Sequence, residues 1–173
     1  MNKRLKLYSM KSLMMILGLM LSVAYAQAQV DTVASRILNA PYHWHGIRDS
    51  REGITLKLIG IYTENAVLYY RLEVTNDSRV PFYPDSPRFY IRDKKRMRRH
   101  AFQEMDQKPT ETIGGMEPIE AGQARVWVVA LAKMIPDVNQ CLVVDLRERG
   151  DTRSLKLTIG CRRILNADFV NDL

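Results

Sequence analysis

The sequence predicts an all-β protein: an antiparallel immunoglobulin-like β-sandwich of about seven strands that follows a cleaved signal peptide. Apolar and polar residues alternate over short runs, which is the period of strands with one buried face. Loops rich in Pro and Gly separate these runs, and the chain after the leader has no apolar pattern with the period of a helix. An incompletely closed barrel would satisfy the same pattern and stays open as the alternative.

The leader has the three parts of a secretory signal peptide in order. Segment 1–11 is basic, an apolar run extends from Leu13 to Val23, and Ala24-Tyr25-Ala26 or Ala26-Gln27-Ala28 offers a cleavage site. The apolar run of about eleven residues is short, because a membrane-spanning helix needs roughly 20. We therefore expect an exported, processed chain.

About 145 residues then remain, which is enough for one domain with its own core. We divide the chain into a signal peptide (1–28), an N-terminal arm (29–44), a β-sandwich domain (45–162) and a C-terminal tail (163–173). The arm is expected to be exposed and irregular, and the tail to form a loose terminal turn.

Two alternating runs, Ile54–Ile61 and Val67–Thr75, predict the first hairpin. Thr63-Glu64-Asn65 fits a three-residue loop between them, with Asn65 in the left-handed conformation. The apolar faces of the two strands then coincide. The expected pairs are Leu68 with Gly60, Tyr70 with Leu58, Leu72 with Leu56, and Val74 with Ile54.

Prolines and glycines punctuate the middle of the chain. We expect a shaped loop over Val80–Pro87, the strand Arg88–Arg92, a second loop over Pro109–Gly122, and the apolar strand Arg125–Leu131.

The segment Cys141–Gly160 predicts a second hairpin, with Gly150-Asp151 as a two-residue turn. This turn pairs Cys141 with Gly160 and leaves Cys161 on the opposite face of the sheet. The two Cys residues should therefore not form a disulfide, unless a bulge shifts the parity. The core-facing pairs are Leu142 with Ile159, Val144 with Leu157, and Leu146 with Leu155.

The positive charge of the chain is concentrated in one segment. The net charge is +7, and four of the positive charges lie in the leader, at Lys3, Arg4, Lys6 and Lys11, which leaves +3. Seven basic residues against the single Asp93 make the segment from Arg88 to Arg99 +6 on its own, so the remainder is −3. The basicity thus marks a site-sized patch and not the whole surface.

This basic patch is the candidate partner-binding site, with Arg92, Lys94, Lys95, Arg96, Arg98 and Arg99 as its residues. In an extended segment alternate residues share a face, so Arg92, Lys94, Arg96 and Arg98 would form a stripe suited to phosphate, anionic glycan or an acidic protein. The alternative is a solvated edge whose charges prevent sheets from pairing. Nucleic acid is not the expected ligand, because stacking aromatics are not interleaved in the run.

The sequence gives little sign of a metal site or of catalysis. His43 and His45 could share a strand face, but a third ligand is not evident and His100 is the only other His. There is no Gly-x-Ser-x-Gly elbow and no phosphate loop, and the carboxylates are scattered. We therefore expect no enzyme activity, no metal, no cofactor and no small-molecule substrate.

Several segments resemble the C-terminal part of the conjugative transposon protein TraN of Bacteroidetes, over roughly residues 45–160. The resemblance lies in His45-Gly46-Ile47-Arg48, Gly53-Ile54-Thr55-Leu56, Tyr69–Val74 with Asn76 and Ser78, Arg88–Lys95, Arg98-Arg99, Ala101 and Gln103-Glu104. It implies export and a structural role in an envelope-spanning transfer channel of type IV secretion character. Family members usually carry a further domain before this one, so the chain resembles a shortened member.

Together the residues and the resemblance predict an exported structural, partner-binding component of a conjugative transfer apparatus, in the periplasm or at the periplasmic face of the outer membrane. Its partners would be other mating-apparatus proteins, with membrane association only through them, and homo-oligomerisation stays open. Two binding modes are open: strand addition at a sheet edge and docking of an acidic surface on Arg92 to Arg99. The alternative function is a free-standing periplasmic binding module for anionic glycan or DNA.

Overall fold

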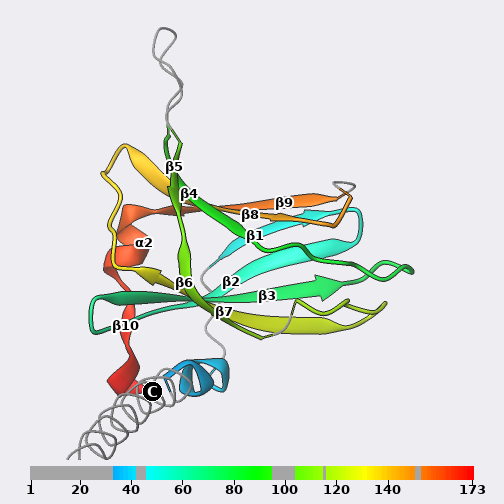
Figure 1. Cartoon of the computed structure of the whole chain (residues 1–173), viewed down its shortest axis with the longest axis horizontal. Coiled ribbons are helices and arrows are strands. Elements are labelled where there is room, and N and C mark those ends of the chain that lie inside the picture. The colour runs from blue at the N-terminus through cyan, green and yellow to red at the C-terminus, as the bar shows by residue number, and fades with distance from the viewer. Residues whose placement is uncertain (1–32, 42–45, 95–103, 115, 151–152) are drawn as a thin grey trace, which may run out of the picture. The chain divides into compact units, whose positions relative to one another are not determined.

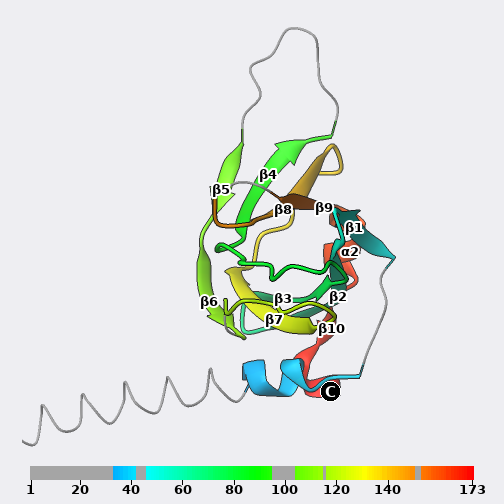
Figure 2. The same ribbon diagram turned by 90° about the vertical axis from the view of Figure 1, so that its right-hand side faces the viewer.

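The computed structural model describes residues 33–41, 46–94, 104–114, 116–150 and 153–173. Residues 36–173 form one compact unit, and the fold is described for this unit. Its described part is all-β, as predicted, and the strands form two sheets that face each other, not an incompletely closed barrel (Figure 1, Figure 2).

Ten strands lie in the described residues, against the about seven predicted. The first sheet has the order β1-β2-β3-β7-β6, and β10 pairs in parallel with β2. The second has the order β5-β4-β8-β9, and every pairing in it is antiparallel. The bounds in the first sheet are β1 Ile47–Arg51, β2 Ile54–Glu64, β3 Val67–Asn76, β6 Pro109–Ile113, β7 Ala124–Ala132 and β10 Asp168–Phe169. Those in the second are β4 Arg88–Asp93, β5 Met105–Gln107, β8 Gln140–Arg147 and β9 Ser154–Gly160.

One hydrophobic core fills the space between the sheets. Trp127 on β7 is fully buried in it, and Tyr70 on β3 packs against Phe89 on β4, with ring centroids 6.1 Å apart. The alternation that predicted strands is visible in β9, where Leu155, Leu157 and Ile159 are buried and Lys156 is exposed. Burial of alternate positions from both sheets is the main force that holds the sheets together.

The predicted second hairpin is confirmed in its register. Cys141 pairs with Gly160, Leu142 with Ile159, Val144 with Leu157, and Leu146 with Leu155. Gly150 has a φ of +92°, which suits glycine in a tight turn. Asp151, the other residue of the predicted turn, lies outside the described residues.

The predicted register of the first hairpin is wrong. The loop is Asn65-Ala66, with φ of 47° and 61°, so Leu58 pairs with Leu72 and not with Tyr70. Two successive left-handed residues match the twist of the flanking strands, which favours a two-residue turn. A bulge between Leu58 and Gly60 shifts the register once more. Between Ile54 and Leu58 the observed register differs from the predicted one by two residues. An even shift keeps each side chain on its face, so the apolar faces of the two strands still coincide there.

The expected loop from Pro109 to Gly122 begins instead with strand β6. Strand β5 pairs with β4 in the second sheet, and β6 pairs with β7 in the first, with only Lys108 between them. One nearly continuous strand thus passes from one sheet to the other (Figure 2).

On the opposite side β1 and β9 lie side by side in both views (Figure 1, Figure 2), and the N–H of Lys156 donates to Oδ2 of Asp49 at 2.8 Å.

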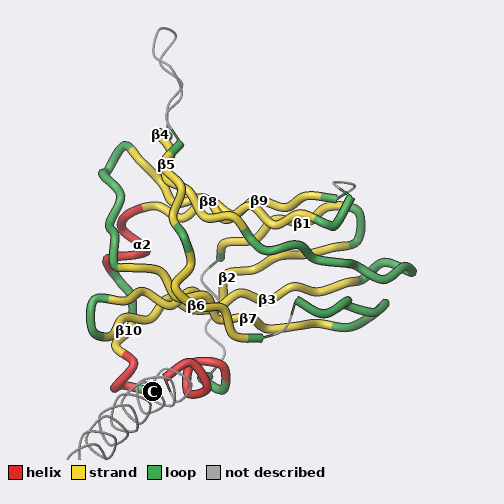
Figure 3. Tube along the Cα trace, in the orientation of Figure 1, coloured by secondary structure: helices red, strands yellow, loops and turns green. Residues whose placement is uncertain are grey.

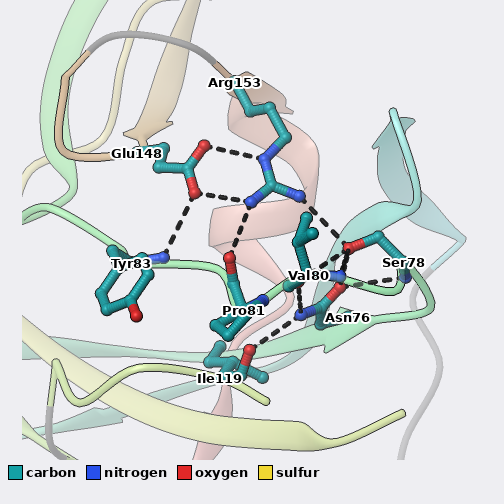
Figure 4. Close-up of polar contacts among 8 residues, drawn as sticks. All are labelled: Asn76, Ser78, Val80, Pro81, Tyr83, Ile119, Glu148 and Arg153. Carbon is teal, nitrogen blue, oxygen red and sulfur yellow. Dashed lines mark hydrogen bonds and ion pairs between the residues drawn. The ribbon is translucent and has the colours of Figure 1, made fainter. Parts of the chain in front are cut away.

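The loop after β3 is fixed by the fully buried Asn76 (Figure 4). Its Nδ2 donates to the carbonyls of Val80 and Ile119 at 2.9 and 2.8 Å. Its Oδ1 accepts from the backbone N–H and the hydroxyl of Ser78 at 3.0 and 2.6 Å, which closes an Asx turn. The prediction of a shaped loop over Val80–Pro87 is confirmed, and isolated bridges at Phe82 and Pro84 tie it down further.

A buried ion pair attaches this loop to the second hairpin. Arg153 donates through Nε and Nη2 to the two carboxylate oxygens of Glu148, and Nη2 also reaches the carbonyl of Pro81 at 3.0 Å (Figure 4). Hydrogen bonding to Glu148 raises the pKa of Arg153. The guanidinium also lies 5.2 Å from the ring centroid of Phe82, so Arg153 makes a cation–π contact in addition to its ion pair.

The arm and the tail are more ordered than expected. Residues 36–38 are helical and Ile37 is fully buried, while Arg71 of β3 donates to the carbonyls of Leu38, Ala40 and Pro41. The expected loose turn at the tail is wrong, because α2 (Cys161–Leu165), β10 and the short helix η1 (Val170–Asp172) follow one another there (Figure 3). Val170 is buried, and its carbonyl accepts from Arg36 at 2.8 Å.

Candidate partner-binding site

The structure places two of the six predicted partner-binding residues, Arg92 and Lys94. The other four, Lys95, Arg96, Arg98 and Arg99, lie outside the described residues. The predicted strand Arg88–Arg92 is β4, and it pairs with β8 so that Arg92 lies opposite Cys141.

Lys94 follows β4 directly and is fixed at both ends. Its backbone N–H donates to the carbonyl of Asn139 at 2.7 Å, and its Nζ donates to the carbonyl of Val138 at 2.6 Å. These bonds hold the ammonium group beside the turn that leads into β8 while its side chain stays exposed. The ammonium group therefore places a positive charge at a defined position on the surface.

Two further arginines join Lys94. Strand pairing sets Arg92 of β4, Cys141 of β8 and Gly160 of β9 in one row across the sheet, and α2 begins immediately after Gly160. Arg162 and Arg163 in α2 therefore lie near Lys94, although nearly 70 residues separate them along the chain. Six residues line a hollow of about 350 Å³ there: Lys94, Val138, Gly160, Cys161, Arg162 and Arg163. We call it the cationic hollow.

The lining of the cationic hollow has three positive side chains and no acidic one. Arg162 and Arg163 are exposed, so their charges face solvent. Sequence reasoning missed both, because they fall at the predicted boundary between the β domain and the tail. The signal was present: the predicted register already set Cys141 opposite Gly160, two residues before the first arginine.

Arg88, by contrast, is neutralised within the domain. Its guanidinium contacts Asp106 at 2.7 Å and Glu104 at 3.0 Å and lies 4.5 Å from the ring centroid of Tyr90. Counting it in the +6 segment therefore overstated the charge available to a partner.

The outer face of the second sheet holds a buried carboxylate, Asp145. Its Oδ2 lies 2.9 Å from Nζ of Lys156 and 3.4 Å from Nη2 of Arg147. The hydrogen bond to Asp145 raises the pKa of Lys156. Because cations from two strands neutralise it, the carboxylate has a structural explanation.

The remaining predicted features give no competing site. Cys141 and Cys161 are free and buried. His43, His45 and His100 lie outside the described residues, and within the described ranges no group of three His, Cys, Asp or Glu could hold a metal. The absence of catalysis stays a prediction.

The fold and the hollow define an all-β domain of two sheets with a cationic site at one end. A family model described as "Domain of unknown function (DUF4138)" matches residues 27–169, so the chain belongs to the DUF4138 family. The searches of curated proteins and of solved structures found no match. Among the helices in the described ranges, none has the length and apolar character needed to cross a membrane.

Proposed function

We propose that this DUF4138 chain is an exported structural component of a conjugative transfer apparatus of the TraN kind, and that it works by binding other proteins of that apparatus. It would act in the periplasm or at the periplasmic face of the outer membrane, after cleavage of residues 1–28. In this proposal the two sheets form an immunoglobulin-like sandwich, which serves as the scaffold for a binding site on its surface.

The cationic hollow is the observation that carries the partner-binding part of this proposal. Lys94, Arg162 and Arg163 come from two distant segments and line one hollow without an acidic neighbour in its lining. Such a concentration of one charge sign steers encounter with an acidic surface and disfavours wrong partners. The predicted candidates Lys95, Arg96, Arg98 and Arg99 follow Lys94 in the chain and lie outside the described residues.

The rest of the proposal is supported by the resemblance to TraN, since the family description itself assigns no function. The segments that resemble TraN fall inside the range matched by the family model. Several of their residues have architectural roles: Arg71 donates to the carbonyls of Leu38, Ala40 and Pro41, and Asn76 and Ser78 shape the loop after β3.

The test is a crosslinking pull-down from envelope fractions of donor cells, with three forms of the full chain and a fourth as a control. One is the wild type, the second carries Lys94→Glu, Arg96→Glu and Arg98→Glu, and the third carries Arg162→Glu and Arg163→Glu. Arg79→Glu is the charge control, because Arg79 is exposed in the loop after β3, at the other end of the sheets. Thermal unfolding first establishes that all forms are folded.

We expect the wild type and the control to recover mating-apparatus proteins and the two charge-reversed forms to lose them. If the wild type recovers none, the proposal fails. The free-standing module for anionic glycan or DNA then becomes the better reading, and steep salt dependence with an isolated polyanion would favour it.

A further inference from the structure

A second hollow shares helix α2 with the cationic one. It has a volume of about 420 Å³ and lies where the β2–β3 turn, the segment after β7 and the C-terminal elements meet. The first three residues of α2 line the cationic hollow and its last two line this second one. Seven of its twelve lining residues are apolar, namely Ala66, Leu68, Ile135, Ile164, Leu165, Ala167 and Phe169, and the other five are Thr63, Glu64, Asn65, Lys133 and Asn171. We call it the apolar hollow.

Three of these apolar side chains are strongly exposed. Phe169 is 64% exposed, Leu165 60% and Ile135 43%. Val138, which lines the cationic hollow, is 65% exposed. Single exposed apolar residues are ordinary on protein surfaces, but several around one opening mark an interaction site.

The two hollows on either side of α2 differ in the charge of their lining residues. Glu64 and Lys133 line the apolar hollow, so its charged residues balance, whereas the cationic hollow has three positive residues and none of the opposite sign in its lining. A complementary ligand must therefore be apolar on one side of α2 and acidic on the other.

We infer that α2 is the centre of a docking site for an extended segment of a partner protein, in which a bulky apolar side chain lies close to two or more acidic ones. The apolar side chain enters the apolar hollow, and the acidic ones face Lys94, Arg162 and Arg163. The inference rests on the proposed function, since it takes the occupant to be a protein partner.

The shape of the site favours a peptide segment over a membrane. Leu165, Phe169 and Ile135 surround a hollow, whereas membrane-surface anchors present an apolar face that enters the headgroup layer. Its volume lies near the lower end of the range of about 300–1,000 Å³ for sites that enclose a ligand. A charged rim next to an apolar anchor pocket is the usual arrangement of a protein interface.

The experiment measures binding of a fluorescein-labelled synthetic peptide to the full chain by fluorescence anisotropy. The peptide contains a Leu-Phe pair flanked by two Asp and two Glu residues. Two control peptides replace either the Leu-Phe pair by Ala-Ala or the four acids by Lys. The protein variants are Leu165→Ser with Phe169→Ser for the apolar hollow, and Arg162→Glu with Arg163→Glu for the cationic one.

Control variants carry single changes of the same two kinds away from α2, at exposed positions in the loop after β3: Val80→Ser and Arg79→Glu. We expect each α2 variant and each control peptide to weaken binding at least tenfold and the control variants to stay within twofold. No binding by the wild type, or dependence on charge alone, overturns the inference. Binding to anionic phospholipid vesicles without binding to the peptide also overturns it, as does self-association of the chain that the α2 variants abolish.

Repeating the pull-down with Leu165→Ser and Phe169→Ser separates the two proposals. If this variant recovers mating-apparatus proteins as well as the wild type does, the proposed function stands and the docking site is wrong. If the wild type recovers none but peptide binding follows the expected pattern, the proposed function is wrong and the docking site stands.

Discussion

The guanidinium of Arg153 holds both carboxylate oxygens of Glu148, at 2.7 Å from Nε and 2.6 Å from Nη2, with side chains only 10% and 8% exposed. The pair attaches the loop after β3 to the second hairpin, through the carbonyl of Pro81 and the backbone N–H of Tyr83. Two-point geometry and burial both strengthen this ion pair.

Removing Glu148 should therefore be costly. Glu148→Ala leaves Arg153 charged and largely buried, and we expect the free energy of unfolding to fall by about 3–5 kcal/mol. Urea denaturation followed by tryptophan fluorescence measures this loss. The control is Glu104→Ala at the exposed pair with Arg88, which should lower the free energy of unfolding far less because solvent screens the pair. Equal losses at the two sites would contradict the interpretation.

Replacing Asn76 should also lower the free energy of unfolding, because its side chain makes several hydrogen bonds in the loop after β3. Asn76→Ala removes the amide that donates to the carbonyls of Val80 and Ile119 and accepts from Ser78. Each carbonyl keeps one other donor, Oγ of Ser78 for Val80 and the N–H of Phe82 for Ile119. The loss is therefore that of the hydrogen bonds themselves, about 1 kcal/mol each and about 2–4 kcal/mol together. Ser78→Ala, which leaves the Asn76 amide in place, should cost about 1 kcal/mol. Thermal unfolding of both variants checks the order, and a larger loss for Ser78→Ala would refute it.

The turn of the first hairpin offers a stabilising change. Ala66 has a φ of 61°, which glycine adopts without the cost that a Cβ imposes, and Asn-Gly is the favoured pair for this turn. We expect Ala66→Gly to raise the free energy of unfolding by about 0.5–1 kcal/mol. Ala121→Gly is the matched control, since Ala121 lies in a turn without a positive φ. A destabilised Ala66→Gly variant would be the contrary result.

Asp49 should protect a sheet edge. Its carboxylate accepts a hydrogen bond from the backbone N–H of Lys156 on the edge strand β9. Without this bond, the N–H could pair with a strand of another chain. We expect Asp49→Ala to increase self-association in sedimentation-velocity runs with little loss of stability. Asp49→Asn retains an acceptor oxygen and should behave like the wild type. A monomeric Asp49→Ala chain at every concentration would show that the edge is protected by other means.

Burial of Tyr70 predicts a loss of stability at high pH. Desolvation raises the pKa of its phenol, so the folded state keeps the proton when the unfolded chain, with a pKa of about 10, loses it. The stabilising contribution is complete below that value and declines as the pH rises through and beyond it. Tyr70→Phe should flatten the fall of unfolding free energy above pH 10. An unchanged slope would assign the effect to other groups.

The sequence predicted those parts of the fold where turn chemistry and alternation agree. The second hairpin has a glycine with a positive φ and uninterrupted alternation, and its register was correct. The first was wrong because Ala66 gives no turn signal and because the bulge between Leu58 and Gly60, which a glycine inside a strand can mark, was not anticipated. Strand β6 was missed because Gly114, Gly115 and Pro118 made its surroundings resemble a loop.

The candidate site was predicted only in part, for a geometric reason. A run of charge is visible along the chain, so Lys94 was named with its neighbours. Arg162 and Arg163 reach Lys94 only across three paired strands, through the row Arg92, Cys141 and Gly160. Two registers had to be known together before these side chains could be placed near one another.

The strand that changes sheets at Lys108 has a mechanical consequence. Force applied to the backbone just before Met105 enters β5, which is hydrogen-bonded to β4, and continues through β6 into the ladder with β7. Strain from that point is therefore shared between two hydrogen-bonded ladders in different layers, and the layers can separate at this strand only if β5 leaves β4 or β6 leaves β7.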